Sequence, residues 1–264
     1  MKRSFIDQMG RDVSIEWPPK RIISLVPSQT EFLYWLGLKE EVVGITKFCI
    51  HPEEWFRSKT RIGGTKKIDF IKIEALKPDL IIGNKEENEE VQVKHLIEQY
   101  PVWMSDIHNL EDAYDMMNGI GAIVNRTEKA QELVSEIKRS FEELNGLQHP
   151  ARTVAYFIWK EPYMVAGQNT FLTDMLSKCD LRNVFMDCKD RYPTITKEEI
   201  KKQSPDIILL SSEPYPFSEK HIDEFQQICP KAKIALVDGE YFSWYGSRLL
   251  GAPAYFNKVL KEIE

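Results

Sequence analysis

Two segments of the chain place an amphipathic run directly before Pro-Asp and an unbroken aliphatic run directly after it. The first segment covers residues 73–82 and the second covers residues 200–210. The residue before a proline is disfavoured in the α-helical region, so we expect a helix to end and a strand to begin at each Pro-Asp pair. Aliphatic runs without polar alternation are typical of strands covered on both faces, as in parallel sheets.

The wide separation of these two segments indicates two similar halves. Pro78 and Pro205 lie much further apart than the roughly 20 to 50 residues of a solenoid repeat. Each half alternates strands and helices, which is the pattern of an α/β fold. Ser28 and Glu31 have the spacing of a capping box at the start of the first helix. Besides the elements around Pro-Asp, we predict strands at 21–26, 42–46, 102–104, 153–158 and 233–237, and helices at 28–37, 88–100, 170–176 and 218–228.

An apolar stripe between the halves predicts one long helix. Its members recur at spacings of three, four and seven: Ile123, Ala130, Leu133, Val134, Ile137, Phe141 and Leu144. A helix over 127–145 is about 28 Å long at ~1.5 Å per residue, which suits a stiff link between two lobes. An ordinary surface helix of either lobe has the same pattern. The predicted domains are an N-terminal α/β lobe at 1–122, a linking backbone helix at 123–148 and a C-terminal α/β lobe at 149–264.

The composition agrees with two globular domains and argues against nucleic-acid binding. Of the 264 residues 42% are hydrophobic, so each half has enough apolar surface for a core of its own. The formal charge is −6, and the lysines are interleaved with glutamates, which leaves no basic face. No stretch reaches the roughly 18 apolar residues of a membrane span, and no apolar segment follows the first charged residues. We therefore expect no membrane insertion, and we find no export signal in the sequence as written.

The common catalytic motifs are absent from the sequence. There is no glycine-rich nucleotide motif, no G-x-S-x-G and no H-E-x-x-H, which favours a protein that is not an enzyme. Cys49 and His51 could hold a metal ion, because alternate residues of an extended loop point the same way. A third ligand from Asp238 or Glu240 would be needed, and ordinary loop packing is the alternative interpretation.

Aromatic residues gather in the predicted loops that follow strands. Such loops lie at the carboxyl ends of parallel strands, where open α/β sheets bind their ligands. Aromatic side chains there offer broad apolar contact to a large, flat or amphipathic ligand. Each of them singly could equally be part of a core, but together they predict a ligand cleft. They are Phe48, Trp55, Trp159, Tyr163, Tyr192 and the run 241–245.

Several motifs, in this order along the chain, resemble those of the substrate-binding proteins of cobalamin and iron-siderophore ABC importers. The motifs are FIDQMGR at 5–11, KRIISLVPSQTE at 20–31, ALKPDLII at 75–82, VAGQNTFL at 165–172 and NVF at 183–185. The resemblance implies two α/β lobes, each with a mainly parallel sheet flanked by helices. It also implies one long backbone helix joining the lobes, a ligand cleft between them and little hinge motion.

Within that family the chain is most similar to the cobalamin-binding member, and this implies a set of ligand-binding residues. Aromatic positions of that member fall on Phe48 and Tyr192, and its acidic and aromatic positions after the last strand resemble Glu240 and Tyr241. Two of its tryptophans fall near Thr65 and Asn84, which are not aromatic, so haem, a siderophore or another corrinoid stays open. The expected set is Phe48, Thr65, Asn84, Tyr163, Met164, Tyr192, Glu240, Tyr241 and Trp244.

The resemblance also implies that one carboxylate on each lobe docks onto the membrane subunits of an importer. The second-lobe carboxylate matches Glu198, which could equally be a glutamate favoured by a helix dipole. Its first-lobe counterpart falls on Ile71, with Asp69 and Glu74 as stand-ins. A cysteine of the cobalamin-binding member matches Cys179, but that cysteine's disulfide partner falls on Phe256, so we expect no disulfide there.

Three functions remain as hypotheses at this point. The first is a monomeric, non-catalytic receptor without covalent cofactor that delivers cobalamin, haem or a ferric siderophore to an ABC importer from a periplasmic or surface location. The second is a metal-ion receptor or metal-dependent protein using Cys49 and His51. The third is a cytosolic ligand-binding descendant that has lost transport, suggested by the missing export signal and by Ile71.

Overall fold

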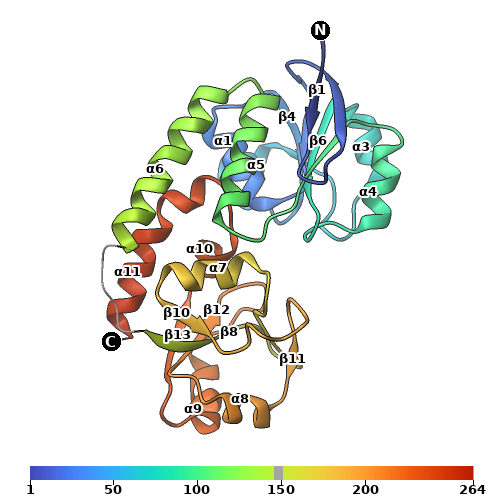
Figure 1. The fold of residues 1–264 in the computed structure, drawn as a ribbon. Coiled ribbons are helices and arrows are strands. Elements are labelled where there is room, and N and C mark those ends of the chain that lie inside the picture. Colours follow the sequence, from blue (N-terminus) through green and yellow to red (C-terminus); the bar gives the residue numbers. More distant parts are fainter. Residues whose placement is uncertain (146–150, 264) are drawn as a thin grey trace. The chain divides into compact units, whose positions relative to one another are not determined.

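The computed structural model describes residues 1–145 and 151–263 and divides the chain into two compact units. Unit 1 comprises Met1–Ile107, Glu111–Glu136 and Tyr245–Arg248, and unit 2 comprises His108–Leu110, Ile137–Trp244 and Leu249–Glu264. In each unit a mainly parallel sheet carries helices on both faces (Figure 1), so the predicted α/β fold with two similar lobes is confirmed.

The large sheet of unit 1 is parallel throughout, in the order β5-β4-β3-β6-β7. Helices α3 and α4 cover one face, and α1 and α5 cover the other (Figure 1). Ile23 and Ile81 from the sheet pack with Ile73, Val93 and Leu96 from α3 and α4 in a buried core. The elements are β3 (Ile22–Ser24), α1 (Pro27–Trp35), β4 (Val42–Ile45), α2 (Glu53–Ser58), β5 (Thr60–Arg61), α3 (Phe70–Leu76), β6 (Leu80–Asn84), α4 (Glu90–Ile97), β7 (Val102–Ser105) and α5 (Leu110–Ile123).

The first Pro-Asp pair ends α3 and fixes the start of two neighbouring strands. Lys77, before the proline, has φ of 45°, so the helix stops there as predicted. The Asp79 carboxylate then accepts hydrogen bonds from the backbone N–H groups of Lys20 and Arg21, at 2.7 and 2.8 Å. Because Arg21 directly precedes β3, this one side chain fastens β3 beside β6.

The sheet of unit 2 has the order β11-β9-β8-β12-β13, and β10 also pairs with β8. Strands β8, β10, β12 and β13 are parallel, whereas β9 and β11 add an antiparallel margin. Helices α8 and α9 cover one face, and α7 and α10 cover the other (Figure 1). The elements are β8 (Arg152–Trp159), β9 (Tyr163–Val165), α7 (Phe171–Lys178), β10 (Leu181–Asn183), β11 (Thr194–Ile195), α8 (Lys197–Gln203), β12 (Ile207–Ser211), η1 (Glu219–His221), α9 (Ile222–Ile228), β13 (Lys233–Val237), α10 (Gly239–Ser243), η2 (Ser247–Leu250) and α11 (Ala252–Glu262).

The second Pro-Asp pair repeats this arrangement with different atoms. Ser204 has φ of 44° and ends α8. Oδ2 of Asp206 accepts from both the backbone N–H and the hydroxyl of Thr153, at 2.8 and 2.7 Å. These two bonds lower the pKa of Asp206. The aspartate of each copy therefore fastens the neighbouring strand, here β8 beside β12.

The predicted long helix is present as α6 (Thr127–Asn145) with the predicted bounds. The assignment of residues changes from unit 1 to unit 2 inside this helix, between Glu136 and Ile137. In its second half, Phe141 contacts Phe256 of α11, with 6.3 Å between the ring centroids. That the helix acts as a stiff link, and that the domains divide at 122 and 148, stays a prediction.

The predicted capping box of the first helix is wrong. Pro27 occupies the first turn of α1, the N-cap is Val26, and no side chain caps the helix. Ser28 is buried instead, and the Glu31 carboxylate accepts two hydrogen bonds from the Arg248 guanidinium, at 2.7 and 3.1 Å. Proline at the first helical position supplies no N–H, which reduces the need for a cap.

An N-terminal hairpin that the sequence analysis missed is formed by β1 (Lys2–Ile6) and β2 (Asp12–Glu16). Its turn is built on Asp7, whose buried carboxylate pairs with Arg11 at 2.5 Å. The same carboxylate accepts the backbone N–H of Met104 in β7 at 3.2 Å, and Arg11 donates to the Val102 carbonyl at 3.1 Å.

Two further observations concern the membrane and the cysteines. Within residues 1–145 and 151–263, no helix combines the length and the apolar character that crossing a bilayer requires. All four cysteines are free thiols, and Cys179 and Phe256 are both buried.

We predict that Asp79→Asn destabilises the protein more than Asp206→Asn. Each oxygen of Asp79 serves a different N–H group, so an asparagine must leave one of them facing its own amide. Both Thr153 bonds end on one oxygen of Asp206, which an asparagine oxygen can replace. We expect a loss of about 1–2 kcal/mol in unfolding free energy for Asp79→Asn and about half of that for Asp206→Asn.

Urea unfolding followed by circular dichroism measures both changes. Asp115→Asn is the matched control, because Asp115 is exposed on α5 and has no hydrogen bond in the described part of the chain. Equal midpoints for Asp79→Asn and the control would contradict the role given to Asp79.

Candidate ligand-binding site

The topology of each sheet marks one place for a ligand. In unit 1 the chain leaves β3 toward β4 on one side and continues from β6 to β7 on the other, so the direction reverses between β3 and β6. In unit 2 the reversal lies between β8 and β12. Open α/β sheets bind ligands outside the carboxyl ends of the strands at such switch points.

Polar side chains line the carboxyl ends of the unit 1 strands. Ser24, Thr46, Asn84 and Ser105 each end or directly follow a parallel strand, and all four are buried. Gln29 of α1, also buried, donates to Oγ of Ser105 at 2.7 Å. This network gives unit 1 a fixed polar floor beneath its loops.

Two of the predicted ligand residues, Thr65 and Asn84, belong to this floor. The Asn84 amide donates to Oγ of Ser105 at 3.0 Å, and its carbonyl oxygen accepts from the backbone of Glu86 and Glu87. Thr65 is buried, and its backbone carbonyl accepts from the Asn88 amide at 3.1 Å. Both residues therefore shape the loops from below.

Phe48 stands at the surface of the loop after β4. Its side chain is 50% exposed, and Ile50 beside it is 46% exposed. Oγ1 of Thr46 accepts the backbone N–H of Phe48 at 3.3 Å, and the Lys47 ammonium lies 4.9 Å from the ring centroid. The loop thus presents an apolar tip whose backbone is anchored on the polar floor.

The two predicted metal ligands, Cys49 and His51, differ in burial. The Cys49 thiol is fully buried and contacts the hydroxyls of Thr30 and Thr46 at 3.1 and 3.2 Å. Burial raises the pKa of this thiol, which disfavours the thiolate that a metal ion needs. His51 is only half-buried. No cluster of three metal-ligating side chains occurs in residues 1–145 and 151–263.

At the unit 2 switch point, Trp159 and Tyr215 form an aromatic pair. Trp159 ends β8 and is 39% exposed, and Tyr215 follows β12, with 5.6 Å between the ring centroids and an interplanar angle of 70°. The backbone N–H of Tyr215 donates to the Ile158 carbonyl at 3.3 Å, which ties the two loops together. The sequence analysis missed Tyr215, although its place just after a Pro-Asp strand was a usable signal.

Tyr163 and Met164, both half-buried on β9, lie at the antiparallel margin of the unit 2 sheet. The Tyr163 hydroxyl donates to the Glu224 carboxylate, which also receives Lys160 at 2.6 Å. Burial opposes ionisation of Glu224, but the bonds from Lys160 and Tyr163 outweigh it and lower the pKa of Glu224 to about 2. Tyr163 therefore carries a structural hydrogen bond as well as a partly accessible ring.

The aromatic run after β13 is mostly core. Phe242, Trp244 and Tyr245 are buried, and so is Trp55 of α2, which agrees with the core packing that the sequence analysis left open for each aromatic residue. Tyr241 stacks on Tyr255 with centroids 4.5 Å apart, and Glu240 and Tyr192 are half-buried.

A half-buried carboxylate, Glu213, contacts this run. Its Oε1 accepts from the Trp244 indole at 2.9 Å and from the Ser243 hydroxyl at 2.7 Å. Burial, together with the negative charges of Glu240 and Asp238, raises the pKa of Glu213. The loops after β12 and β13 thus form an acidic surface that favours hydrogen-bond donors over further carboxylates.

The predicted docking carboxylates differ in their local contacts. Glu198 is exposed in the first turn of α8, and its carboxylate makes no hydrogen bond within the described residues. Asp69 caps α3 by accepting the Lys72 N–H at 3.2 Å, whereas Glu74 on the same helix is exposed. Ile71, at the position of the first-lobe carboxylate, is 80% exposed.

Comparison with known proteins identifies a family and several similar proteins. The family model described as periplasmic binding protein matches residues 22–228. The vitamin B12-binding protein of Pectobacterium carotovorum subsp. carotovorum (strain PC1) is 25% identical over 240 residues, covering 88% of this chain and 85% of the relative. The uncharacterized ABC transporter substrate-binding lipoprotein YvrC of Bacillus subtilis (strain 168) is 29% identical over 218 residues, covering 77% and 67%.

Solved structures share the fold over nearly the whole chain. The periplasmic vitamin B12 binding protein BtuF of Vibrio cholerae has a TM-score of 0.81 at 21% identity, covering 93% of this chain and 98% of that one. The periplasmic heme-binding protein RhuT from Roseiflexus sp. RS-1 has a TM-score of 0.79 at 18% identity, covering 92% and 98%. At these identities the likeness shows the two-lobed fold alone.

We predict that Glu213→Gln stabilises the protein at neutral pH. A carboxyl group with a raised pKa binds a proton more readily in the folded than in the unfolded chain. Unfolding free energy therefore falls as pH rises from about 4.3, the pKa of an unperturbed glutamate, through the folded pKa of Glu213. Glutamine keeps the oxygen that accepts from Ser243 and Trp244 but has no charge to bury.

Thermal unfolding at pH 4 to 8 measures this effect. The variant should match the wild type near pH 4 and exceed it increasingly toward pH 8. Glu132→Gln, at an exposed position on α6, should leave the profile unchanged. Parallel profiles for wild type and Glu213→Gln would contradict the raised pKa.

Proposed function

Because this chain belongs to the periplasmic binding protein family, we propose that it is a non-catalytic receptor for a large chelated or corrinoid-type ligand, which it delivers to an ABC importer. The observation that carries the proposal is the pair of aromatic surfaces at the carboxyl ends of the two sheets. Phe48 provides one, and Trp159 with Tyr215 provides the other. A broad, partly apolar ligand suits such surfaces, because aromatic rings bury large areas at low entropic cost.

The proposed ligand contacts are the residues that the family resemblance indicates, joined by Tyr215. Phe48, Tyr192 and Tyr241 contact the ligand with their rings, and Glu240 accepts hydrogen bonds from it. Thr65, Asn84 and Trp244 act mainly by holding the loops, because their own contacts lie within the polar floor or against Glu213. Tyr163 and Met164 form the margin of the unit 2 surface.

The charges after β12 and β13 favour an amide-rich ligand. Glu213, Asp238 and Glu240 lie together there, and the pKa of Glu213 is raised by burial and by its acidic neighbours. Haem carries two carboxylates, which these residues repel, whereas the periphery of a corrinoid carries amide groups that donate hydrogen bonds. The vitamin B12-binding relative agrees with a corrinoid, and haem and ferric siderophores remain alternatives for the test.

We propose a periplasmic or surface location and an importer as partner, in line with the substrate-binding lipoprotein relative. Glu198 is the proposed docking carboxylate of unit 2, since it is exposed and has no intramolecular use. In unit 1, Glu74 is the more accessible of the two stand-ins because Asp69 caps its own helix.

Titration of tryptophan fluorescence with cobalamin, haemin and a ferric hydroxamate tests the ligand. We expect saturable quenching by cobalamin and weaker binding of haemin. Phe48→Ala should weaken cobalamin binding about tenfold, the loss of one aromatic contact of ~1.4 kcal/mol. Val91→Ala, at an 81% exposed apolar position on α4, should bind as wild type. If folded protein shows no saturable change with any of the three, the receptor function is wrong.

Alanine substitution of two adjacent glutamates tests docking. Both lie in the first turn of α8, but Glu199 accepts from the N–H and hydroxyl of Thr196 at 2.7 and 2.9 Å in a capping box. Glu199→Ala should therefore lower the thermal stability slightly without affecting transport.

Glu198→Ala should lower uptake of labelled ligand by cells while leaving stability and ligand affinity unchanged. The measurements are uptake by cells expressing each variant, thermal unfolding and ligand affinity. Normal uptake with Glu198→Ala would remove Glu198 from the docking surface.

A further inference from the structure

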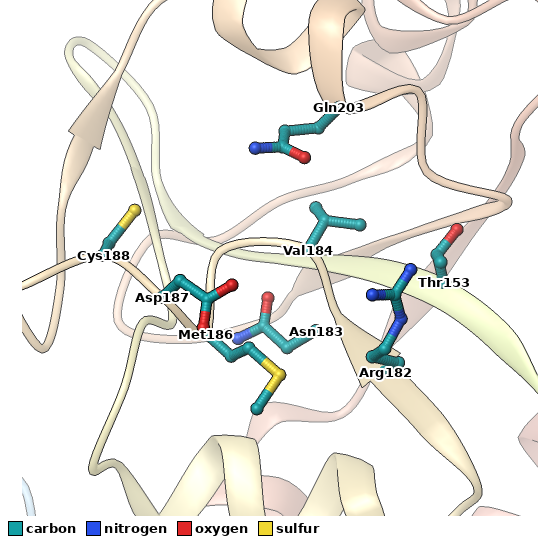
Figure 2. A pocket seen from close by; sticks show the side chains of 8 residues that line it. All are labelled: Thr153, Arg182, Asn183, Val184, Met186, Asp187, Cys188 and Gln203. Atoms are coloured by element: carbon teal, nitrogen blue, oxygen red, sulfur yellow. The ribbon is translucent and has the colours of Figure 1, made fainter.

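Unit 2 contains a pocket of about 280 Å³ away from the carboxyl ends of β8 and β12. It opens beside the first residues of β8, between β10 and the end of α8 (Figure 2). At roughly 30 Å³ for each water molecule, the space accommodates ~9 waters or a comparable number of ligand atoms. A corrinoid or haem is far too large for it, so a ligand of this pocket would have to be a different molecule from the one proposed above.

The two copies of the Pro-Asp unit differ at the place where this pocket opens. Arg21 and Thr153 are at equivalent positions, because each comes just before the residue that pairs with the first residue of the strand after Pro-Asp. Leu76 and Gln203 are also equivalent, because each lies two residues before the proline. In unit 1, Nε of Arg21 donates to the Leu76 carbonyl at 2.8 Å and covers the end of α3. In unit 2 the shorter Thr153 bonds to Asp206, and among the described residues no side chain donates to the Gln203 carbonyl as Arg21 does to that of Leu76.

Three exposed polar side chains face this pocket. The Arg182 guanidinium, the Asp187 carboxylate and the Gln203 amide make no hydrogen bond or ion pair with any described residue. Figure 2 shows Arg182 and Asp187 on opposite sides of the space, with the Gln203 amide directed toward it from α8. Asn183, between them, is fully engaged with Ala166, Thr173 and Phe185 and forms a fixed wall.

The charges around the pocket select the class of ligand. Arg182 offers a planar fork of donors that matches a carboxylate. Two carboxylates, those of Asp187 and of the nearby Asp206, disfavour a simple anion. The pKa of Asp206 is lowered by its bonds to Thr153 and by the charges of Arg152 and Arg182. We propose that this pocket binds a small zwitterion such as a free amino acid, with its carboxylate on Arg182, its ammonium on Asp187 and a polar group on Gln203.

A ligand-observed NMR screen of the natural amino acids, followed by calorimetry of the strongest binder, tests the proposal. We expect one or more to bind, and we expect analogues lacking either the ammonium or the carboxylate to bind at least tenfold more weakly. Arg182→Gln and Asp187→Asn should each weaken binding about tenfold or more, as expected for lost charge-assisted bonds. Lys189→Gln is the matched control, an exposed cation outside the pocket lining.

Three results would overturn the proposal. These are no amino acid binding tighter than about 10 mM, equal binding of the single-charge analogues, or unchanged affinity in both pocket variants. The analogue comparison uses the wild-type chain, so it decides the question even if a variant proves unstable. Cobalamin binding by Arg182→Gln should equal that of the wild type, which separates this pocket from the receptor function.

Discussion

An aspartate that directly follows a helix-ending proline fixes the central strand pair of each unit. The helix before it stops at a residue of positive φ, and the carboxylate then binds the backbone at the start of the adjacent parallel strand. Parallel strands have no tight turn to set their register. A side chain that accepts hydrogen bonds from the backbone of the neighbouring strand can set it instead. Because β3-β6 and β8-β12 are also the switch points, the two aspartates align the strand ends from which the candidate loops emerge.

The two units use their strand ends differently. Unit 1 has a closed network of buried hydroxyls and amides, from which one loop carries Phe48 and Ile50 to the surface. Unit 2 has instead an aromatic pair and a group of carboxylates, with Glu213 kept in place by Ser243 and Trp244. The first arrangement contributes rigidity and an apolar tip, and the second contributes stacking area and acceptors.

The fold was accessible from the sequence because its signals are local and periodic. The stripe from Ala130 to Leu144 predicts α6 with its observed bounds, and both Pro-Asp pairs mark a helix end and a buried strand. Ser28 misled because the helix already begins at Pro27, which places Ser28 inside its first turn and not at the N-cap. Burial of loop aromatics was not accessible. Trp55 and Trp244 follow predicted strands just as Phe48 does, so the sequence does not distinguish them from it. Their burial depends on tertiary neighbours, which include Tyr34 for Trp55 and Glu213 for Trp244. Tyr215, which lies between Pro214 and Pro216, was not recognised as a candidate. The roles of the candidate site residues stay predictions.

The N-terminal hairpin has a consequence for association between copies of the chain. Strand β7 is the last strand on its side of the unit 1 sheet. The outward backbone groups of an edge strand can pair with a strand of another molecule unless they are covered. Asp7 and Gln8 occupy both hydrogen-bonding groups of Met104, and Arg11 occupies the Val102 carbonyl. The N-terminal hairpin thus covers the edge strand of the unit 1 sheet and blocks its pairing with other strands. A chain trimmed at this end would expose these backbone groups of β7 to strands of neighbouring copies.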